Sequence, residues 1–304
     1  MHAGRTVFSQ LLDFAPQHEF RRLVDLHGAS YRLRQFSCWD QFLCMAFAQL
    51  TYRESLRDIE ACLRAAPNLY HLGIRTRSVA RSTLADANEH RSWQLYAEFA
   101  QLLIAIARAL YAGDSFGVEL DNTVYALDST LIDLCLSLCP WARFGCSRGA
   151  IKLHTLLDLR GSIPSFIRVT PGRVSDISTL DHLVYEPGAF YVMDRAYVDF
   201  KRLRRLHQSG AFFVTRSWSN TRVARVESRP VPPGTNVVKD HFIHFAGVHS
   251  RHDFPALARR VCCRASLDVK PLVFLTNHLD LPAATIAELY RCRWRIELFF
   301  KWIK

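Results

Sequence analysis

The amino-acid sequence predicts an α/β protein in which an all-α N-terminal domain precedes a mixed core that carries a β-rich insertion. In residues 8–112 apolar side chains recur at three-to-four spacing, as Leu95 and Phe99 do, which is typical of packed helices. After residue 122 short β-prone runs alternate with helical runs, and this alternation indicates a sheet flanked by helices. We place the helical domain at residues 1–115, the core at 120–304 and the insertion at about 216–268.

The charge balance favours a polyanionic partner. The chain has a formal net charge of +11, from 39 Lys and Arg against 28 Asp and Glu. Residues 1–120 contain 13 basic and 12 acidic side chains, so residues 121–304 carry nearly all of the excess. Such a basic surface suits nucleic acid or an anionic membrane. The hydrophobic fraction of 49% is that of a globular protein with one large domain or two ordinary ones.

Membrane, export and zinc signals are weak. The most apolar stretch, residues 95–112, contains Glu98 and Arg108 and lacks the roughly 20 apolar residues that a membrane span needs. The N-terminus has no long apolar run before a cleavage site. Nine cysteines without paired C-x-x-C motifs predict reduced thiols, and the four histidines between residues 241 and 252 lack cysteine partners for zinc. We therefore expect a cytoplasmic protein.

A basic turn lies within the helical domain. Residues 73–88 combine turn residues with a Ser/Thr-capped helix start, and they include Arg75, Arg77 and Arg81. Backbone N–H groups and arginine side chains at such a turn can bind phosphates. A solvated loop between two helices would have the same composition, so both interpretations stay open.

The elements of the core follow a linker at residues 112–122. Two strands flanking the turn at residues 160–162 predict a hairpin, and the strands and helices after it alternate. Strands are expected at 123–127, 151–159, 163–169, 189–193, 211–215 and 271–276, and helices at 175–183, 198–208 and 282–304.

Two aspartates come directly after buried strands. Asp128 follows the apolar run of residues 124–127, and Asp194 follows the run of residues 190–193. Strand ends are rigid yet open to solvent, so carboxylates on two adjacent strands can share hard cations through oxygen ligands. Taken alone, each aspartate fits the start of an ordinary turn equally well.

A charged stripe runs along the predicted last helix. Tyr290, Arg293, Glu297 and Lys304 stand at offsets of 0, 3, 7 and 14 residues. At 3.6 residues per turn these positions fall within an arc of about 60°. Apolar residues cover much of the remaining circumference, so the helix packs on several sides and the stripe lines a site. Intrahelical pairing of Arg293 with Glu297, at about 0.2–0.5 kcal/mol, is the alternative explanation.

Together these residues resemble the insertion-sequence-four family of DDE transposases. The four stripe residues match, position for position, the Tyr-Arg-Glu-Lys signature of that family. Ala126-Leu-Asp-Ser-Thr130 is similar to its first aspartate motif, and Met193-Asp-Arg-Ala-Tyr-Val-Asp-Phe200 is similar to its second. The resemblance covers residues 120–304 and implies a ribonuclease-H-like catalytic core with a β-rich insertion before the glutamate.

The resemblance also implies which residues form the site. Asp128, Asp194 and Glu297 would be catalytic and would bind two Mg²⁺ ions, for which Mn²⁺ can substitute. The ions would activate water or a DNA 3′-hydroxyl for attack on a phosphodiester and stabilise the leaving oxygen. The residues expected to contact DNA are Tyr290, Arg293, Lys304, Arg195 and Lys152, together with Arg75, Arg77 and Arg81 of the helical domain.

The function implied is cut-and-paste transposition, with cleavage at insertion-sequence ends and strand transfer into target DNA. The expected partners are double-stranded DNA, as terminal inverted repeats and target, and a second copy in a homodimer on the DNA, which would bring the protein to the nucleoid. Ala196 departs from the glutamate often found in the second motif, and the chain ends at Lys304, the last residue of the signature. A truncated, inactive copy that represses transposition through DNA binding or mixed dimers is the alternative. A nuclease of the same fold that performs no strand transfer is a third possibility.

Overall fold

The chain divides into two compact units, Met1–Ala107 and Arg108–Lys304. The computed structural model describes residues 6–29, 36–66, 69–76, 78–134, 143–144, 148–231, 233–264 and 270–304. The division falls inside helix α6 (Trp93–Leu110), earlier than the boundary expected from the sequence. Each unit has hydrophobic clusters of its own.

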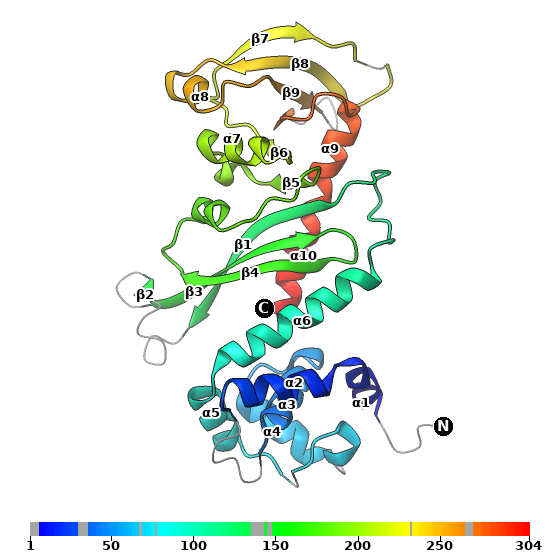
Figure 1. The fold of residues 1–304 in the computed structure, drawn as a ribbon, viewed down its shortest axis with the longest axis vertical. Coiled ribbons are helices and arrows are strands. Elements are labelled where there is room, and N and C mark those ends of the chain that lie inside the picture. The colour runs from blue at the N-terminus through cyan, green and yellow to red at the C-terminus, as the bar shows by residue number, and fades with distance from the viewer. Residues whose placement is uncertain are drawn as a thin grey trace. The chain divides into compact units, whose positions relative to one another are not determined.

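The first unit is helical, as its apolar periodicity predicts (Figure 1). Its helices are α1 (Val7–Leu11), α2 (Gln17–Leu26), α3 (Cys38–Leu50), α4 (Leu56–Ala65), α5 (Arg81–His90) and most of α6. Ser37 and Asp40 form a capping box on α3, which satisfies N–H groups that a helix start leaves free. The fully buried ring of Phe20 lies 5.0 Å from that of Trp39 and 4.9 Å from that of Phe99, and so joins α2, α3 and α6. Within the described residues no helix is both long and apolar enough to cross a bilayer.

The second unit is built on a mixed sheet, in which ten strands are described (Figure 1). The strands are β1 (Val124–Leu134), β2 (Arg143–Phe144), β3 (Arg148–Asp158), β4 (Ile163–Pro171), β5 (Phe190–Met193), β6 (Phe212–Arg216), β7 (Val223–Ser228), β8 (Val237–Phe245), β9 (Ala258–Cys263) and β10 (Leu272–Thr276). Strands β4, β3 and β1 pair antiparallel, whereas β5 pairs parallel with β1 and β6 with β5. This order and these directions are those of the ribonuclease-H-like sheet, so the predicted fold class is confirmed.

The β-rich insertion lengthens this sheet and does not form a separate layer. Strands β7, β8 and β9 pair antiparallel in turn, and β9 pairs with β10, which pairs with β6. A short helix that the sequence analysis did not predict, α8 (Val248–Asp253), connects β8 to β9. The insertion and the core therefore belong to one hydrogen-bonded sheet.

Two helical segments on one side of the core are shorter than predicted. The helix expected at residues 175–183 is a 3₁₀ turn, Asp176–Asp181, and a second 3₁₀ turn, Arg195–Tyr197, follows Asp194. Helix α7 (Phe200–Gln208) begins two residues later than predicted because the Asp199 side chain caps it by accepting from the Arg202 N–H.

The helix predicted at residues 282–304 is divided at Arg293, and the prediction of one continuous helix was wrong. It consists of α9 (Ala283–Cys292) and α10 (Trp294–Ile303). At the junction the Arg293 N–H donates to the Tyr290 carbonyl and the Ile296 N–H to the Arg293 carbonyl. This three-residue hydrogen-bond spacing tightens the turn. The side chains on either side of Arg293 therefore point in other directions around the axis than one ideal helix would give them.

Both faces of the sheet are covered, and this explains the apolar runs in the sequence. Side chains alternate along a strand, so Leu127 and Met193 contribute to one core while Ala126 and Val192 contribute to the other. The second core also contains buried side chains of α9 and α10. Strands that are buried on both faces read as continuous apolar runs, and each of these two runs ends at an aspartate.

Candidate active site

The register of the two central parallel strands brings Asp128 and Asp194 next to each other. The last pair between β1 and β5 is Leu127 opposite Met193, so the two aspartates take the following position on each strand. Alternation along β1 puts Asp128 on the same face as Ala126, which α9 and α10 cover. Asp194 follows the end of β5, as the sequence predicts, whereas Asp128 lies inside β1, which continues to Leu134 and pairs Asp128 with Thr155 of β3. The prediction that this strand ends at residue 127 was wrong, because the hairpin partner β3 extends the pairing beyond Asp128.

Arg293 connects this pair to Glu297. Its Nη1 donates to Asp128 Oδ2 at 2.6 Å, and its Nη2 donates to Glu297 Oε1 at 2.5 Å. The Arg293 side chain is 14% exposed, Asp128 is 22% and Glu297 is 29%. The intrahelical ion pair considered for Arg293 and Glu297 is present, but the same guanidinium also binds a carboxylate 165 residues away. Local pairing within the helix therefore accounts for only one of the two ion pairs of Arg293.

The environment of Asp128 disfavours its charge. Burial raises the pKa of its carboxyl group, and the nearby charges of Asp194 and Glu297 raise it further. The N–H of Ser129, which donates to Asp128 Oδ1 at 2.8 Å, and the Arg293 guanidinium oppose this shift. For Arg293, burial works against the charged form, but Asp128, Tyr290 and Glu297 together raise its pKa. The site thus concentrates negative charge around one buried cation.

Asp194 is held by the turn that follows it. Its side chain caps the 3₁₀ turn by accepting from the Ala196 N–H, and its carbonyl accepts from the Thr215 hydroxyl at 3.1 Å. Ala196, the departure from the family motif, is exposed. Its backbone therefore orients the Asp194 carboxylate, although its side chain adds no acid.

The remaining stripe residues differ in their surroundings. The ring centre of Tyr290 lies 4.9 Å from that of Phe274 and 5.7 Å from the guanidinium carbon of Arg293. Burial raises the pKa of its hydroxyl, which keeps the group protonated. Tyr290 and Arg293 also line a mostly apolar hollow of about 550 Å³ beside β9 and β10. Lys304 is exposed at the end of α10.

A second polar cluster lies at Ser129 on the opposite face of β1, and the sequence analysis missed it. The Ser129 hydroxyl donates to Asp176 Oδ1 at 2.6 Å, and Lys152 Nζ lies 2.9 Å from the same oxygen. Lys152 is 13% exposed and also donates to the Val174 carbonyl, so it is enclosed by the protein in this structure. Asp176 is not among the site residues that the sequence predicts. The spacing of residues along the chain gives no sign of this contact.

Arg195 and Trp218 form an exposed pair next to Asp194. The guanidinium carbon of Arg195 lies 4.8 Å from the centre of the Trp218 ring, which is a cation–π distance. Trp218 is 43% exposed and Arg195 is exposed. A basic and an aromatic surface therefore lie directly after the second aspartate.

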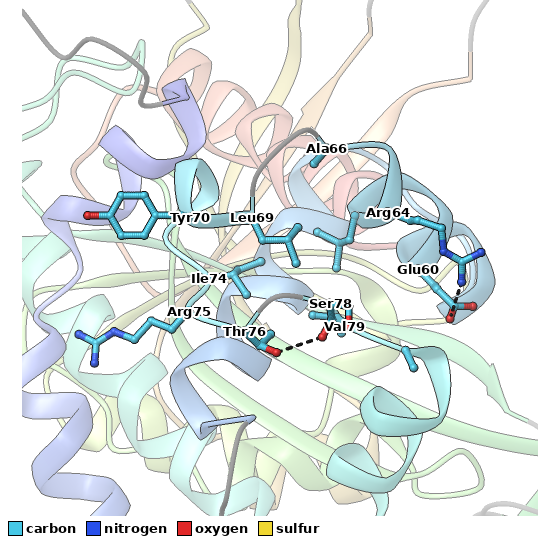
Figure 2. A pocket seen from close by; sticks show the side chains of 12 residues that line it. Glu60, Arg64, Ala66, Leu69, Tyr70, Ile74, Arg75, Thr76, Ser78 and Val79 are labelled. Atoms are coloured by element: carbon cyan, nitrogen blue, oxygen red, sulfur yellow. Dashed lines mark hydrogen bonds and ion pairs between the residues drawn. The ribbon is translucent and has the colours of Figure 1, made fainter.

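The basic turn of the helical unit is described in part. Arg75 and Arg81 are both exposed, while Arg77 lies outside the described residues. The Arg75 N–H donates to Asp40 Oδ1 at 3.0 Å, which anchors the turn to α3. Figure 2 shows the Arg75 side chain extending away from the Glu60–Arg64 ion pair of a hollow of about 400 Å³. This turn is compatible with both interpretations of the sequence, phosphate binding and a solvated loop.

The carboxylates of the site have the chemistry that a hard divalent cation needs. Asp128, Asp194 and Glu297 supply only oxygen atoms, which Mg²⁺ prefers, and a cation would offset the unfavourable charge of the buried Asp128 carboxylate. Among the described residues, no three acidic, histidine or cysteine side chains are grouped closely enough to hold one ion as they stand. Arg293 bonds to Asp128 and Glu297 at the same time.

Comparisons with known proteins agree with this reading of the core. Residues 119–304 match the family described as "Transposase DDE domain", and residues 3–75 match a "Domain of unknown function (DUF4372)". The protein named "Putative transposase y4zB" from Sinorhizobium fredii is 31% identical over 75% of this chain and 63% of its own length. The "Probable transposase for insertion sequence element IS5377" from Geobacillus stearothermophilus is 27% identical over 59% of this chain and 47% of its own length.

The chain thus spans less than two thirds of the length of these relatives. Among solved structures, the piggyBac transposase synaptic complex with hairpin DNA aligns with 99% of this chain and 69% of that chain, at 14% identity and a TM-score of 0.47. That similarity is too low to support any argument about function. The family match covers more than half of the residues and contains both aspartates, Arg293 and Glu297. The chain belongs to the transposase DDE domain family.

Proposed function

We propose that this protein is a DNA transposase that cleaves the ends of an insertion sequence and joins them to target DNA by a cut-and-paste route. The observation that carries the proposal is the cluster in which Arg293 joins Asp128 and Glu297 beside Asp194. Asp128 lies inside β1 and Asp194 directly after β5, the two adjacent parallel strands of a DDE domain. Positions on or next to the strands of a rigid sheet are suited to holding catalytic groups in a fixed geometry.

In this proposal Asp128, Asp194 and Glu297 hold two Mg²⁺ ions, which Mn²⁺ can replace. When bound, the ions would supply Lewis-acid activation of the attacking oxygen and charge stabilisation of the leaving oxygen. The Ala196 N–H orients Asp194 and the Ser129 N–H orients Asp128, so each carboxylate is positioned by the backbone next to it. DDE domains in general depend on divalent metal ions, which the donor set here suits.

The DNA contacts of the proposal come from side chains around the three carboxylates. Arg293 and Lys304 bind backbone phosphates near the cleaved strand, and the protonated Tyr290 hydroxyl donates to the terminal phosphate. Arg195 and Lys152 extend the basic surface, with Lys152 leaving its contact with Asp176 to do so. Arg75, Arg77 and Arg81 of the helical unit bind the element ends. The active form is a homodimer that holds two inverted repeats.

The test is Mg²⁺-dependent nicking of labelled DNA that carries the element's own ends, with the wild type and the Glu297→Gln variant. Loss of a metal-binding carboxylate removes several kcal/mol of transition-state stabilisation, which corresponds to a rate loss on the order of a thousandfold. Glu288→Gln is the matched control, because Glu288 lies on the adjacent helix and pairs with the exposed Arg291.

Nicked DNA and joined DNA test different parts of the proposal. Nicking that is lost in Glu297→Gln and kept in Glu288→Gln supports the three-carboxylate site. Joined product in the presence of target DNA supports strand transfer, and nicking without it would reduce the activity to that of a nuclease. A folded wild type that binds the ends and never nicks them would contradict the proposed enzyme.

A further inference from the structure

Arg293 occupies the position in which a cation would bind two of the three carboxylates. Its two terminal nitrogens contact Asp128 Oδ2 and Glu297 Oε1 at 2.6 and 2.5 Å, whereas Asp194 accepts from the Ala196 N–H. These guanidinium hydrogens point at carboxylate lone pairs, which are the same electron pairs that a divalent cation uses. Each carboxylate has further lone pairs, but a metal ion that bridged Asp128 Oδ2 and Glu297 Oε1 would lie against the like-charged guanidinium and compete with it for this position.

The remaining contacts of Arg293 are few. Its Nε is buried and has no hydrogen-bond partner among the described residues. The Tyr290 ring lies 5.7 Å from its guanidinium carbon, and the side chain also borders the apolar hollow between α9 and β10. An arginine with a structural role usually has its five donors satisfied by fixed partners. Arg293 is held mainly by the two carboxylates, so it can leave when another cation satisfies them.

We propose that Arg293 is an internal counter-ion that holds Asp128 and Glu297 together before metal binding, and that a divalent cation must displace its guanidinium from both carboxylates. The inference rests on the proposed function, since it assumes that these carboxylates bind metal. It assigns Arg293 two successive partners: the carboxylates in the metal-free protein, and a DNA phosphate once the cation has entered. Metal binding and exposure of a phosphate-binding group are then coupled in one side chain.

The coupling has a measurable cost. In this scheme Mn²⁺ binds only to molecules in which Arg293 has left Asp128 and Glu297. The apparent Mn²⁺ affinity is therefore the intrinsic affinity multiplied by the fraction of such molecules. Arg293→Gln is therefore expected to bind Mn²⁺ more tightly than the wild type, by about fivefold or more. Without divalent ions the same variant is expected to melt at a lower temperature, because Asp128 and Glu297 lose their shared cation. Saturating Mn²⁺ should then raise its melting temperature by more than that of the wild type.

The experiment measures free Mn²⁺ by electron paramagnetic resonance during titration of the full chain, without DNA, together with melting curves at zero and saturating Mn²⁺. Arg295→Gln, in the first turn of α10 and two residues after Arg293, is the control. Arg295 donates to the carbonyls of Leu159 and Phe116 and to no carboxylate, so its loss lowers stability without strengthening Mn²⁺ binding. Arg293→Lys serves if the glutamine variant does not fold, because one ammonium group cannot reproduce the forked contact to two carboxylates.

The outcomes separate this inference from the proposed function. Tighter Mn²⁺ binding by Arg293→Gln, or by Arg293→Lys where only that variant folds, supports displacement. Equal or weaker binding, with Mn²⁺ binding abolished in Asp128→Asn, overturns the counter-ion role and leaves the metal site standing. If Asp128→Asn binds Mn²⁺ as the wild type does, the proposed metal site is wrong and the inference is wrong with it.

Discussion

Two arginines of the second unit bind acidic side chains in opposite ways. Arg259 on β9 is 1% exposed and its partner Asp240 on β8 is 4% exposed. Its guanidinium donates twice to Asp240, at 2.8 and 2.7 Å, and also to the carbonyls of Leu279 and Leu281. These bonds use the donors of the group almost completely, and they tie the insertion to the loop that leads into α9.

Arg293 is more exposed and less completely bonded. It divides its guanidinium between two carboxylates from different parts of the chain, and its Nε has no partner among the described residues. A buried ion pair stabilises a fold only when its geometry and remaining hydrogen bonds are nearly complete. The closed arrangement around Arg259 is therefore structural, whereas the open one around Arg293 is suited to exchange of partners.

Breaking the closed pair should have the largest effect on stability. Arg259→Met leaves the Asp240 carboxylate buried without its cation, which costs about 3–5 kcal/mol of unfolding free energy. Urea unfolding followed by circular dichroism measures this loss. The double variant Asp240→Leu with Arg259→Met removes both charges and should recover much of it. If Arg259→Met costs less than Arg293→Gln, the distinction between the two arginines is lost.

His154 gives an intermediate effect that depends on pH. Burial lowers the pKa of this fully buried imidazole to about 4, while the unfolded chain titrates near 6.5. Below pH 6.5 the unfolded state therefore binds a proton that the folded state does not. The contribution of His154 to stability is complete above pH 6.5 and falls as the pH is lowered toward 4, by at most about 3.5 kcal/mol at about 1.4 kcal/mol per pKa unit.

The measurement for His154 is the unfolding free energy at pH 7 and pH 5. His154→Gln should lose less stability over this interval than the wild type does. His182→Gln changes an exposed histidine directly after the 3₁₀ turn Asp176–Asp181, and it should keep the pH dependence of the wild type. Equal pH dependence in wild type and His154→Gln would show that the buried imidazole does not govern it.

The smallest effect is expected at a surface pair on α9. Arg291 donates to Glu288 three residues before it, and its side chain is 78% exposed. Exposed pairs of this kind are screened by water and salt and contribute little. Arg291→Gln should therefore leave the melting temperature and the Mn²⁺ affinity unchanged. A clear change in either would show that exposure is a poor guide to the role of these arginines.

Sequence patterns identified the core because strands that are buried on both faces of the sheet consist of continuous apolar residues. The apolar runs before Asp128 and Asp194 are visible for that reason, and the family match contains both. The break at Arg293 was not visible, since a single tightened turn changes two backbone hydrogen bonds and no apolar spacing. Asp176 was missed because a 3₁₀ turn has no marked periodicity and its contact with Ser129 crosses 47 residues.

By itself the sequence determined the fold class, the helical first unit, the two aspartates that follow buried apolar runs and the residue types around Glu297. These follow from local patterns, since periodicity reflects which faces are buried and motifs record the chemistry of single side chains. Only the tertiary structure decided that Arg293 bonds to Asp128, that Lys152 pairs with Asp176, and that the insertion continues the main sheet. The reason is physical: hydrogen bonds and ion pairs between distant segments depend on register and on distances of a few ångströms, which no spacing along the chain specifies.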